Sequence, residues 1–162
     1  MTVLSSHADS ATRTMTFVAE FTAPVAALWR VWAERDLLEK WWGPPAYPAT
    51  VTEFVFEPGG VVRYVMVGDD DGERIDGRLV FVSIVDHAEI VYDDVFIPGD
   101  GGDIPEPDNR TTVTFEQLGD GSRMTLRSTF HTVESFAEAV EYGAEQGYVE
   151  GIGQIDALLA EA

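Results

Sequence analysis

The sequence contains no cysteine, and this absence excludes a wide range of chemistry. Without thiols there are no disulfides, no thiolate nucleophiles and no zinc sites built on sulfur ligands. The common catalytic motifs are missing as well: there is no P-loop, no G-x-S-x-G elbow, no G-x-G-x-x-G after a predicted strand and no H-E-x-x-H. We therefore expect no cofactor, and neither a nucleotide-dependent nor a nucleophilic mechanism.

Positive charge is scarce. There are 29 acidic against 10 basic residues, a formal net charge of −19, and Lys40 is the sole lysine. A charge of this sign repels phosphate backbones and anionic lipid surfaces, which argues against a nucleic-acid partner. Long apolar runs are lacking too, since no stretch approaches the roughly 20 residues needed to cross a bilayer. We expect a soluble protein with no membrane partner.

Residues 1–13 have neither a basic start nor a long apolar run. They are typical of a flexible N-terminal tail rather than a secretory signal, and the cytoplasm is the expected location. The remaining residues, 14–162, fit one domain, because a chain of this size buries roughly 70% of the surface that its unfolded form exposes.

Hydrophobic periodicity predicts the order of the secondary structure. Thr22 and Pro24 mark the start of a helix with Leu28, Trp29 and Trp32 on its apolar face. A second short helix over residues 36–42 stops at a Gly-Pro-Pro sequence. Alternation with a period of two predicts strands at residues 14–21, 51–57, 61–67, 75–85, 90–97, 111–118 and 123–130. Two acidic, Gly-rich segments, residues 68–73 and 99–109, are expected to be surface turns.

The C-terminal part is helical in character. Ser135 and Glu138 have the spacing of a capping box, which predicts a long helix from there to the end of the chain. A sheet of about seven antiparallel strands has one face that must be covered, and this helix is the one element long enough to cover it. The predicted fold is α+β: a curved antiparallel sheet with two short helices after its first strand and the C-terminal helix packed across it.

Glycines at positions 143, 147, 151 and 153 interrupt that helix, and each costs about 0.5–1 kcal/mol relative to alanine. Three of them recur every four residues and so lie along one side of the helix. They either allow helix and sheet backbones to touch or leave a volume that a ligand fills. Gly143 also fits a break between a short helix and the main one.

The segment EKWWGPP places two adjacent tryptophans where a helix must end. An indole here either walls one end of a cavity, with its N–H on a polar partner, or simply fills the core. Apolar side chains with a few hydroxyls face the same interior and are typical of an apolar binding pocket. The candidate ligand-binding residues are Trp42, Tyr64, Met66, Tyr92, Met124, Leu126, Ser128, Tyr148, Gly151, Ile152 and Ile155.

Asp93 and Asp94 lie in a predicted strand, so one of them points inward. The alternation alone does not decide which. A buried aspartate would need a partner such as Arg63, Arg78 or Arg127, or would have a raised pKa suited to acid–base work. A metal site is not expected, because His131 and Glu134 have no third imidazole ligand nearby in sequence. Residues 79–85 are apolar on both faces, which favours cover by a second subunit in a homodimer.

Four stretches occur in a characteristic order: APVAALWRVWAERDLLEKWWGPP, FEPGGVVRYVM, DGERIDGRLVFV and YVEGIGQIDALL. In this order they resemble the activator of heat-shock protein 90 ATPase homologue family, part of the START-like, or Bet v 1-like, helix-grip superfamily. The resemblance extends over residues 15–160. It implies a helix-grip fold with an internal cavity between the sheet and the last helix.

The resemblance implies no single activity, because one fold hosts many functions. The leading hypothesis is a non-enzymatic domain that binds a small hydrophobic molecule in the cavity. A second is a co-chaperone-like module that binds a heat-shock protein 90 homologue. A third is a cyclase or hydratase-like enzyme that uses a buried acid such as Asp94 with Tyr92 or His131.

Overall fold

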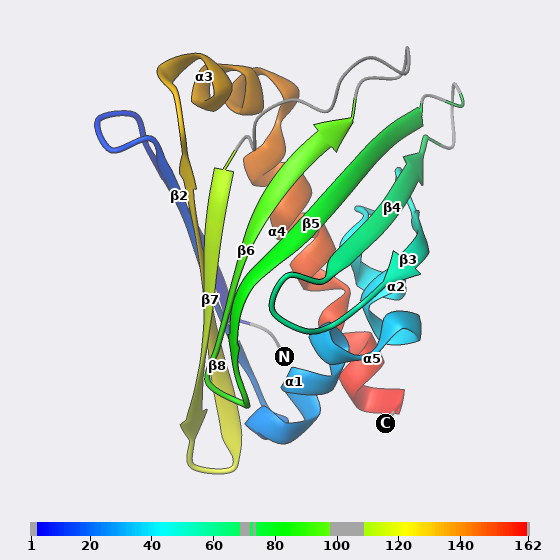
Figure 1. Cartoon of the computed structure of the whole chain (residues 1–162). Coiled ribbons are helices and arrows are strands. Elements are labelled where there is room, and N and C mark those ends of the chain that lie inside the picture. Colours follow the sequence, from blue (N-terminus) through cyan, green and yellow to red (C-terminus); the bar gives the residue numbers. More distant parts are fainter. Residues whose placement is uncertain (1–2, 69–71, 73, 98–108, 162) are drawn as a thin grey trace.

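The computed structural model describes residues 3–68, 72, 74–97 and 109–161 of the chain. Eight strands and five helices are formed in this part (Figure 1). The strands are β1 (Val3–Asp9), β2 (Thr14–Phe21), β3 (Ala49–Phe54), β4 (Val61–Val67), β5 (Arg74–Val85), β6 (Glu89–Ile97), β7 (Asn109–Leu118) and β8 (Gly121–Phe130). The helices are α1 (Val25–Ala33), α2 (Arg35–Trp42), α3 (Val133–Tyr142), α4 (Ala144–Gly153) and α5 (Ile155–Glu161).

The strands form one antiparallel sheet in the order β1-β2-β8-β7-β6-β5-β4-β3. The sheet is curved and does not close, so β1 and β3 are its edges (Figure 1). Its alternation is regular: in β2 every second residue from Met15 to Phe21 is buried, as the sequence pattern predicts for a strand with one face on the core. The predicted α+β fold class is confirmed.

The N-terminal residues differ from the expectation of a flexible tail. Val3–Asp9 form β1, which pairs with β2 from Val3 opposite Glu20 to Asp9 opposite Thr14. The segment is short and mostly polar, so its own side chains give little indication of a strand. The exposed edge of β2 supplies the missing partner, because its backbone N–H and C=O groups are satisfied when β1 pairs with them.

The two helices after β2 form a bent pair over the concave face of the sheet. Glu34, in an extended conformation, ends α1 and begins α2. Pro24, rather than Thr22, is the N-cap of α1, and its side chain makes no capping hydrogen bond. Trp41 is buried at the end of α2 and its indole N–H donates to the Val31 carbonyl at 2.8 Å, which ties the two helices together.

The C-terminal segment is three helices rather than one. Gly143 ends α3 in the left-handed conformation, with φ of 77°, which favours glycine. The capping box of α3 is formed by Thr132 and Ser135 instead of Ser135 and Glu138, because the helix begins three residues earlier than the sequence pattern indicates. Gln154 separates α4 from α5.

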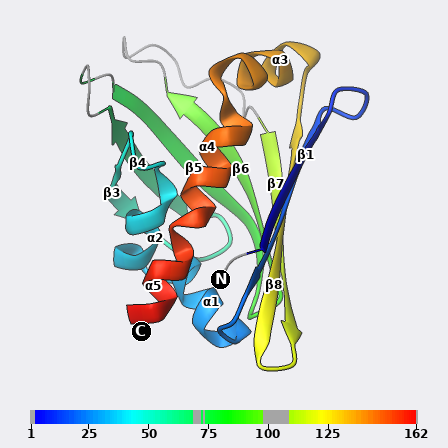
Figure 2. The same ribbon diagram turned by 180° about the vertical axis from the view of Figure 1, so that it is seen from behind.

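Figure 2 shows α4 and α5 running obliquely across the concave side of the sheet, with α1 and α2 beside them. On this side α4 contacts β1, β2 and α2, while α1 contacts β7 and β8. The side chains between the helices and the sheet form a single core that includes Trp29, Trp32 and Trp41. No helix in the described residues is long and apolar enough to cross a membrane.

The convex face of the sheet carries some exposed apolar groups. Val82 is 41% exposed, beside a bulge between Phe81 and Ser83 in β5. Exposed apolar groups on this face are compatible with contact to a second subunit, and the expected homodimer stays a prediction.

The predicted acidic turn at residues 68–73 and loop at residues 99–109 fall largely outside the described residues. Asn109, at the end of that loop segment, is the buried first residue of β7.

Candidate functional site

A buried aspartate lies on the concave face of the sheet. Asp94 on β6 is 2% exposed. The Tyr64 hydroxyl on β4 donates to one of its oxygens at 3.2 Å, and the Tyr148 hydroxyl on α4 lies 3.5 Å from the other. Three separate elements thus place polar groups at one point inside an otherwise apolar core.

The position of Tyr64 depends on a glycine in the neighbouring strand. Tyr64 lies directly opposite Gly77 of β5, and a Cβ atom at Gly77 would collide with the phenol ring. Because Gly77 has no side chain, the ring lies across β5 and its hydroxyl reaches Asp94 one strand further on. The contact between Tyr64 and Asp94 therefore requires a glycine at position 77 of β5.

A second set of polar groups lies on β7 and β8. The Thr111 hydroxyl donates to the Asn109 side-chain oxygen at 2.8 Å and lies 2.7 Å from the Ser128 hydroxyl. All three residues are buried. Tyr92, two residues before Asp94 on β6, is 0% exposed, and its hydroxyl has no hydrogen-bond partner among the described residues. We call Tyr64, Tyr92, Asp94, Thr111, Ser128 and Tyr148 the polar cluster.

Burial raises the pKa of each phenol in the polar cluster. For Tyr64 and Tyr148 the loss of hydration is the largest cause, and the nearby charge of Asp94 raises the pKa further. For Tyr92 burial is again the first cause and Tyr148 the second. An interaction with the Trp42 side chain acts in the opposite direction and lowers the pKa of Tyr64. The three phenols are therefore neutral at physiological pH and act as hydrogen-bond donors.

Aromatic rings surround this cluster. Trp42, the last residue of α2, packs against five rings at centroid distances of 5.5 to 6.3 Å and interplanar angles of 69° to 89°. These rings belong to Trp32, Trp41, Tyr64, Tyr92 and Tyr148. On the opposite side, the ring of Tyr148 lies 5.1 Å from that of Phe17 on β2. Trp42 is only partly buried, so it lies between the polar cluster and the surface.

The two central glycines of α4 have different surroundings. A Cβ atom at Gly151 would lie 3.1 Å from the Trp41 carbonyl oxygen and 3.5 Å from that of Trp42. Gly151 therefore allows close contact between α4 and the end of α2. A Cβ atom at Gly147 would meet nothing within 4 Å. The close contact at Gly151 is thus with α2 and not with the sheet backbone that the sequence suggested, and a ligand volume at Gly147 stays a prediction.

The remaining predicted ligand-binding residues lie in or against the same core. Met124 accepts a hydrogen bond at its sulfur from the Trp32 indole N–H at 3.3 Å. Leu126 on β8, Ile152 on α4 and Ile155 on α5 are fully buried, and Met66 on β4 is partly buried. These positions are compatible with the wall of an apolar site and equally with an ordinary core. Their role stays a prediction.

The structure resolves which aspartate points inward. Asp93 faces outward and forms a two-fold hydrogen-bonded ion pair with Arg110, at 2.8 and 3.0 Å. The expected arginine partner for the inward aspartate is wrong, because Asp94 bonds to phenols instead. In β4, β5 and β8 the three arginines alternate with inward residues and so belong to the outer face; these are Arg63, Arg78 and Arg127.

The chemistry that the polar cluster can support is proton exchange. A carboxyl group within hydrogen-bond reach of two phenols can exchange a proton with a ligand group placed beside it. His131 is exposed and does not join this buried cluster. Within the described part of the chain, no group of three or more His, Cys, Asp or Glu residues is arranged to hold a metal ion.

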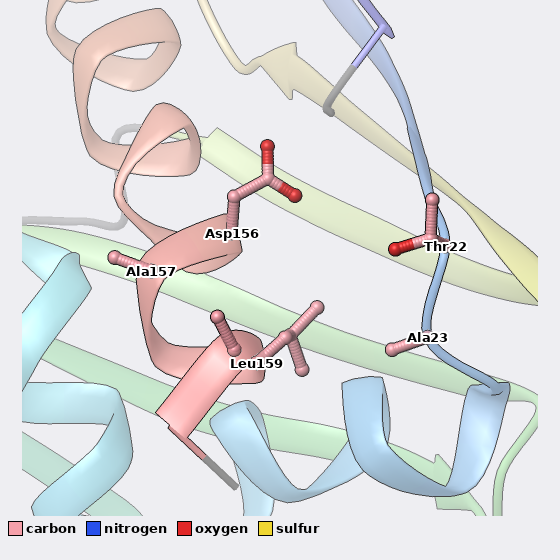
Figure 3. Close-up of a pocket in the computed structure, with 6 residues that line it drawn as sticks. Thr22, Ala23, Asp156, Ala157 and Leu159 are labelled. Atoms are coloured by element: carbon pink, nitrogen blue, oxygen red, sulfur yellow. The ribbon is translucent and has the colours of Figure 1, made fainter.

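A separate hollow of about 430 Å³ lies between the β2–α1 connection and α5. Figure 3 shows Thr22 and Ala23 on one side of it and Asp156 and Leu159 of α5 on the other. None of the predicted ligand-binding residues lines this hollow. It is therefore distinct from the polar cluster.

Sequence reasoning left the Asp94 position open and missed the participation of Gly77, Asn109 and Thr111. One signal was present: Tyr92 was expected inside, and residues two apart in a strand share a face, so Asp94 follows it inward. The Tyr64–Gly77 contact had no such signal, because it depends on the register of β4 against β5.

An open antiparallel sheet that wraps around C-terminal helices, with an aromatic and polar interior between them, defines a START-like helix-grip protein. The chain belongs to the family described as Activator of Hsp90 ATPase homolog 1-like protein, whose profile matches residues 22–160. The resemblance inferred from the sequence is thus confirmed.

Solved structures agree with this assignment. A crystal structure of a Mycobacterium smegmatis protein is 34% identical, with a TM-score of 0.86, and the match covers 98% of this chain and 99% of that one. A solution structure of an Arthrobacter aurescens protein is 37% identical, with a TM-score of 0.89, covering 98% and 92%. An AHSA1 protein from Silicibacter pomeroyi, 18% identical with a TM-score of 0.74 and coverage of 91% and 97%, shares the fold alone. No curated protein matches the chain.

Proposed function

We propose that the protein binds a small, largely apolar molecule between the sheet and α4, next to the polar cluster. The supporting observation is the placement of Asp94 and three phenols inside an aromatic core. Burial of a polar group costs about 1–3 kcal/mol unless a hydrogen bond compensates it. The contacts of Tyr64 and Tyr148 with Asp94 compensate part of this cost, and the hydroxyl of Tyr92 remains uncompensated among the described residues.

The hydroxyl of Tyr92 gives the strongest support for a bound molecule at this position. It is fully buried and makes no hydrogen bond of good geometry among the described residues, although Thr111 and Tyr148 lie near enough to influence its pKa. A bound molecule with a polar group at this point would satisfy the hydroxyl, while the rings around it would receive the apolar part. Ligand binding would then explain why the Tyr92 hydroxyl is buried despite the free energy that its burial costs.

A route of entry is available beside α4. Gly147 faces open space, and Trp42 and Tyr148, whose rings pack against each other, are only partly buried. Movement of these two side chains would connect the polar cluster with the surface. Such movement changes side-chain torsions and leaves the backbone in place, so no rearrangement of the fold is required.

Charge narrows the class of ligand. The chain has a formal net charge of −19, and the carboxyl group of Asp94 lies in the proposed site. Both disfavour an anionic ligand such as a fatty acid. A neutral molecule with one polar group fits the site best.

The experiment is a titration with the neutral fluorescent dye N-phenyl-1-naphthylamine, followed by displacement with neutral lipids and aromatic compounds. We expect saturable binding that Gly147→Leu weakens by at least about tenfold, because a leucine side chain would fill the open space. Gly153→Leu is the matched control, since Gly153 also faces open space but is exposed. Equal affinities of the two variants, or no saturable binding, would contradict the proposal.

A second candidate function is a co-chaperone-like contact with a heat-shock protein 90 homologue, which the family description favours. Such a contact would change the ATPase rate of the chaperone. Measurement of that rate with and without the protein distinguishes the two functions, because a cavity-filling variant such as Gly147→Leu would leave a surface contact unchanged.

A further inference from the structure

We propose that the indole of Trp42 occupies the place of the ligand, and that the ligand is a planar aromatic molecule with an N–H or O–H donor. This inference rests on the proposed function and specifies its ligand class. It derives from the surroundings of Trp42 and from the way in which the backbone on either side of it is held.

The space around Trp42 is shaped for a flat ring. Five aromatic rings meet the indole at interplanar angles between 69° and 89°, so each presents an edge or a face to it. Edge-to-face contacts of this kind favour planar aromatic groups, because the positive edge of one ring meets the negative face of another. A flexible alkyl chain would gain no such contacts.

A donor on the ligand follows from the direction of the hydrogen bonds. The Tyr64 hydroxyl donates its hydrogen to Asp94, so its oxygen still has lone pairs to accept a hydrogen. The Trp42 side chain interacts with that hydroxyl. A ligand that replaces the indole would present its own N–H or O–H group to the same oxygen.

The backbone on either side of Trp42 is held by hydrogen bonds, while its side chain is partly exposed. Gln154 donates to the Trp41 carbonyl at 3.3 Å and to the Gly43 carbonyl at 2.7 Å, and Gly151 packs against the same segment. Trp32 and Trp41 are fully buried and each uses its indole N–H in a hydrogen bond. Of these three tryptophans Trp42 is the partly exposed one. Rotation of its side chain alone would free the space that its indole now fills.

Indole and 1-methylindole are the matched probes, because the methyl group removes the donor while the ring is kept. Calorimetric titration of the full chain should give about fivefold tighter binding of indole, the fold-change that corresponds to one hydrogen bond of typical strength. Tyr64→Phe should abolish the preference. Trp42→Ala should bind indole more tightly than the unmodified chain, since no side chain has to be displaced.

Trp29→Ala is the control, because Trp29 packs against Phe56, Phe115 and His87, away from the polar cluster. The cavity that it leaves should not distinguish the two probes. If Trp42→Ala fails to fold, as judged by circular dichroism, Trp42→Leu takes its place.

The movement of Trp42 has its own readout. Its indole N–H signal, assigned by its loss in Trp42→Phe, should shift in the NMR spectrum when indole binds, while the signal of Trp29 stays in place. Equal affinity for the two probes, tighter binding of 1-octanol than of indole, or an unmoved Trp42 signal would overturn the inference but leave ligand binding intact. If none of these probes nor the naphthylamine dye binds, the proposed function fails together with it.

Discussion

The phenol ring of Tyr64 lies over the backbone of Gly77, and this contact allows a side chain on β4 to reach a carboxyl group on β6. The strand between them must present no side chain at that point. A glycine inside a strand weakens it, so its presence here needs a reason, and the reach of Tyr64 to Asp94 supplies one.

Gly77→Ala should therefore destabilise the protein through a collision with the Tyr64 ring. We expect a loss of about 1–3 kcal/mol in the free energy of unfolding, the usual range for an overpacked site. Urea denaturation measures it. In a Tyr64→Leu background the same substitution should cost much less, because the phenol is gone. Equal costs in the two backgrounds would show that Gly77 does not act through Tyr64.

The glycines of α4 give a paired prediction. Gly147→Ala should raise the free energy of unfolding by about 0.5–1 kcal/mol, because alanine favours the helix and meets no neighbour. Gly151→Ala should lose this gain, because its Cβ atom would press on the Trp41 carbonyl, which Gln154 holds in place. Thermal unfolding of both variants tests the difference. Equal stabilisation by the two substitutions would contradict the assigned roles.

The buried phenols predict sensitivity to alkali. Burial raises the pKa of Tyr64, Tyr92 and Tyr148 above the ordinary value of 10.0, so these groups ionise more easily in the unfolded chain. Their contribution to stability is complete below about pH 10 and is lost as the pH rises above that value. Phenolate absorbance should then show three tyrosines that ionise together with unfolding. Tyr92→Phe should reduce the steepness of this loss, and normal titration of all three before unfolding would contradict the account.

The two adjacent aspartates offer a matched comparison. Asp94→Asn changes a buried group bonded to Tyr64 and Tyr148, whereas Asp93→Asn changes an outward group paired with Arg110. We expect Asp94→Asn to weaken dye binding by about tenfold, because the amide cannot reproduce the hydrogen bonds of the carboxyl group with Tyr64 and Tyr148. Asp93→Asn should leave binding unchanged. Equal effects on binding would remove Asp94 from the proposed site.

Much of the fold follows from periodicity, and the exceptions have physical causes. Residues 14–21 and 61–67 alternate so regularly that their predicted strands agree with β2 and β4 at both ends. The strand β1 was missed because it is stabilised by pairing with β2 rather than by an apolar face of its own. The sequence allowed either a continuous helix or a break at Gly143, and the left-handed backbone of Gly143 shows that the helix breaks there.

The site was predictable only in part. The inward-facing aromatic residues followed from alternation, and so, in principle, did Asp94 two residues after Tyr92. The convergence of Tyr64, Asp94 and Tyr148 was not predictable, because it joins three elements whose distances depend on strand register and on where α4 crosses the sheet.

The most direct test of the central claim is a crystal structure of the protein with the tightest neutral aromatic compound from the displacement titration. The account predicts electron density for the compound against Tyr92 and Asp94, with the Trp42 side chain turned away from its present position. Density for the compound in the hollow between Thr22 and Asp156, with Trp42 unmoved among its aromatic neighbours, would contradict it.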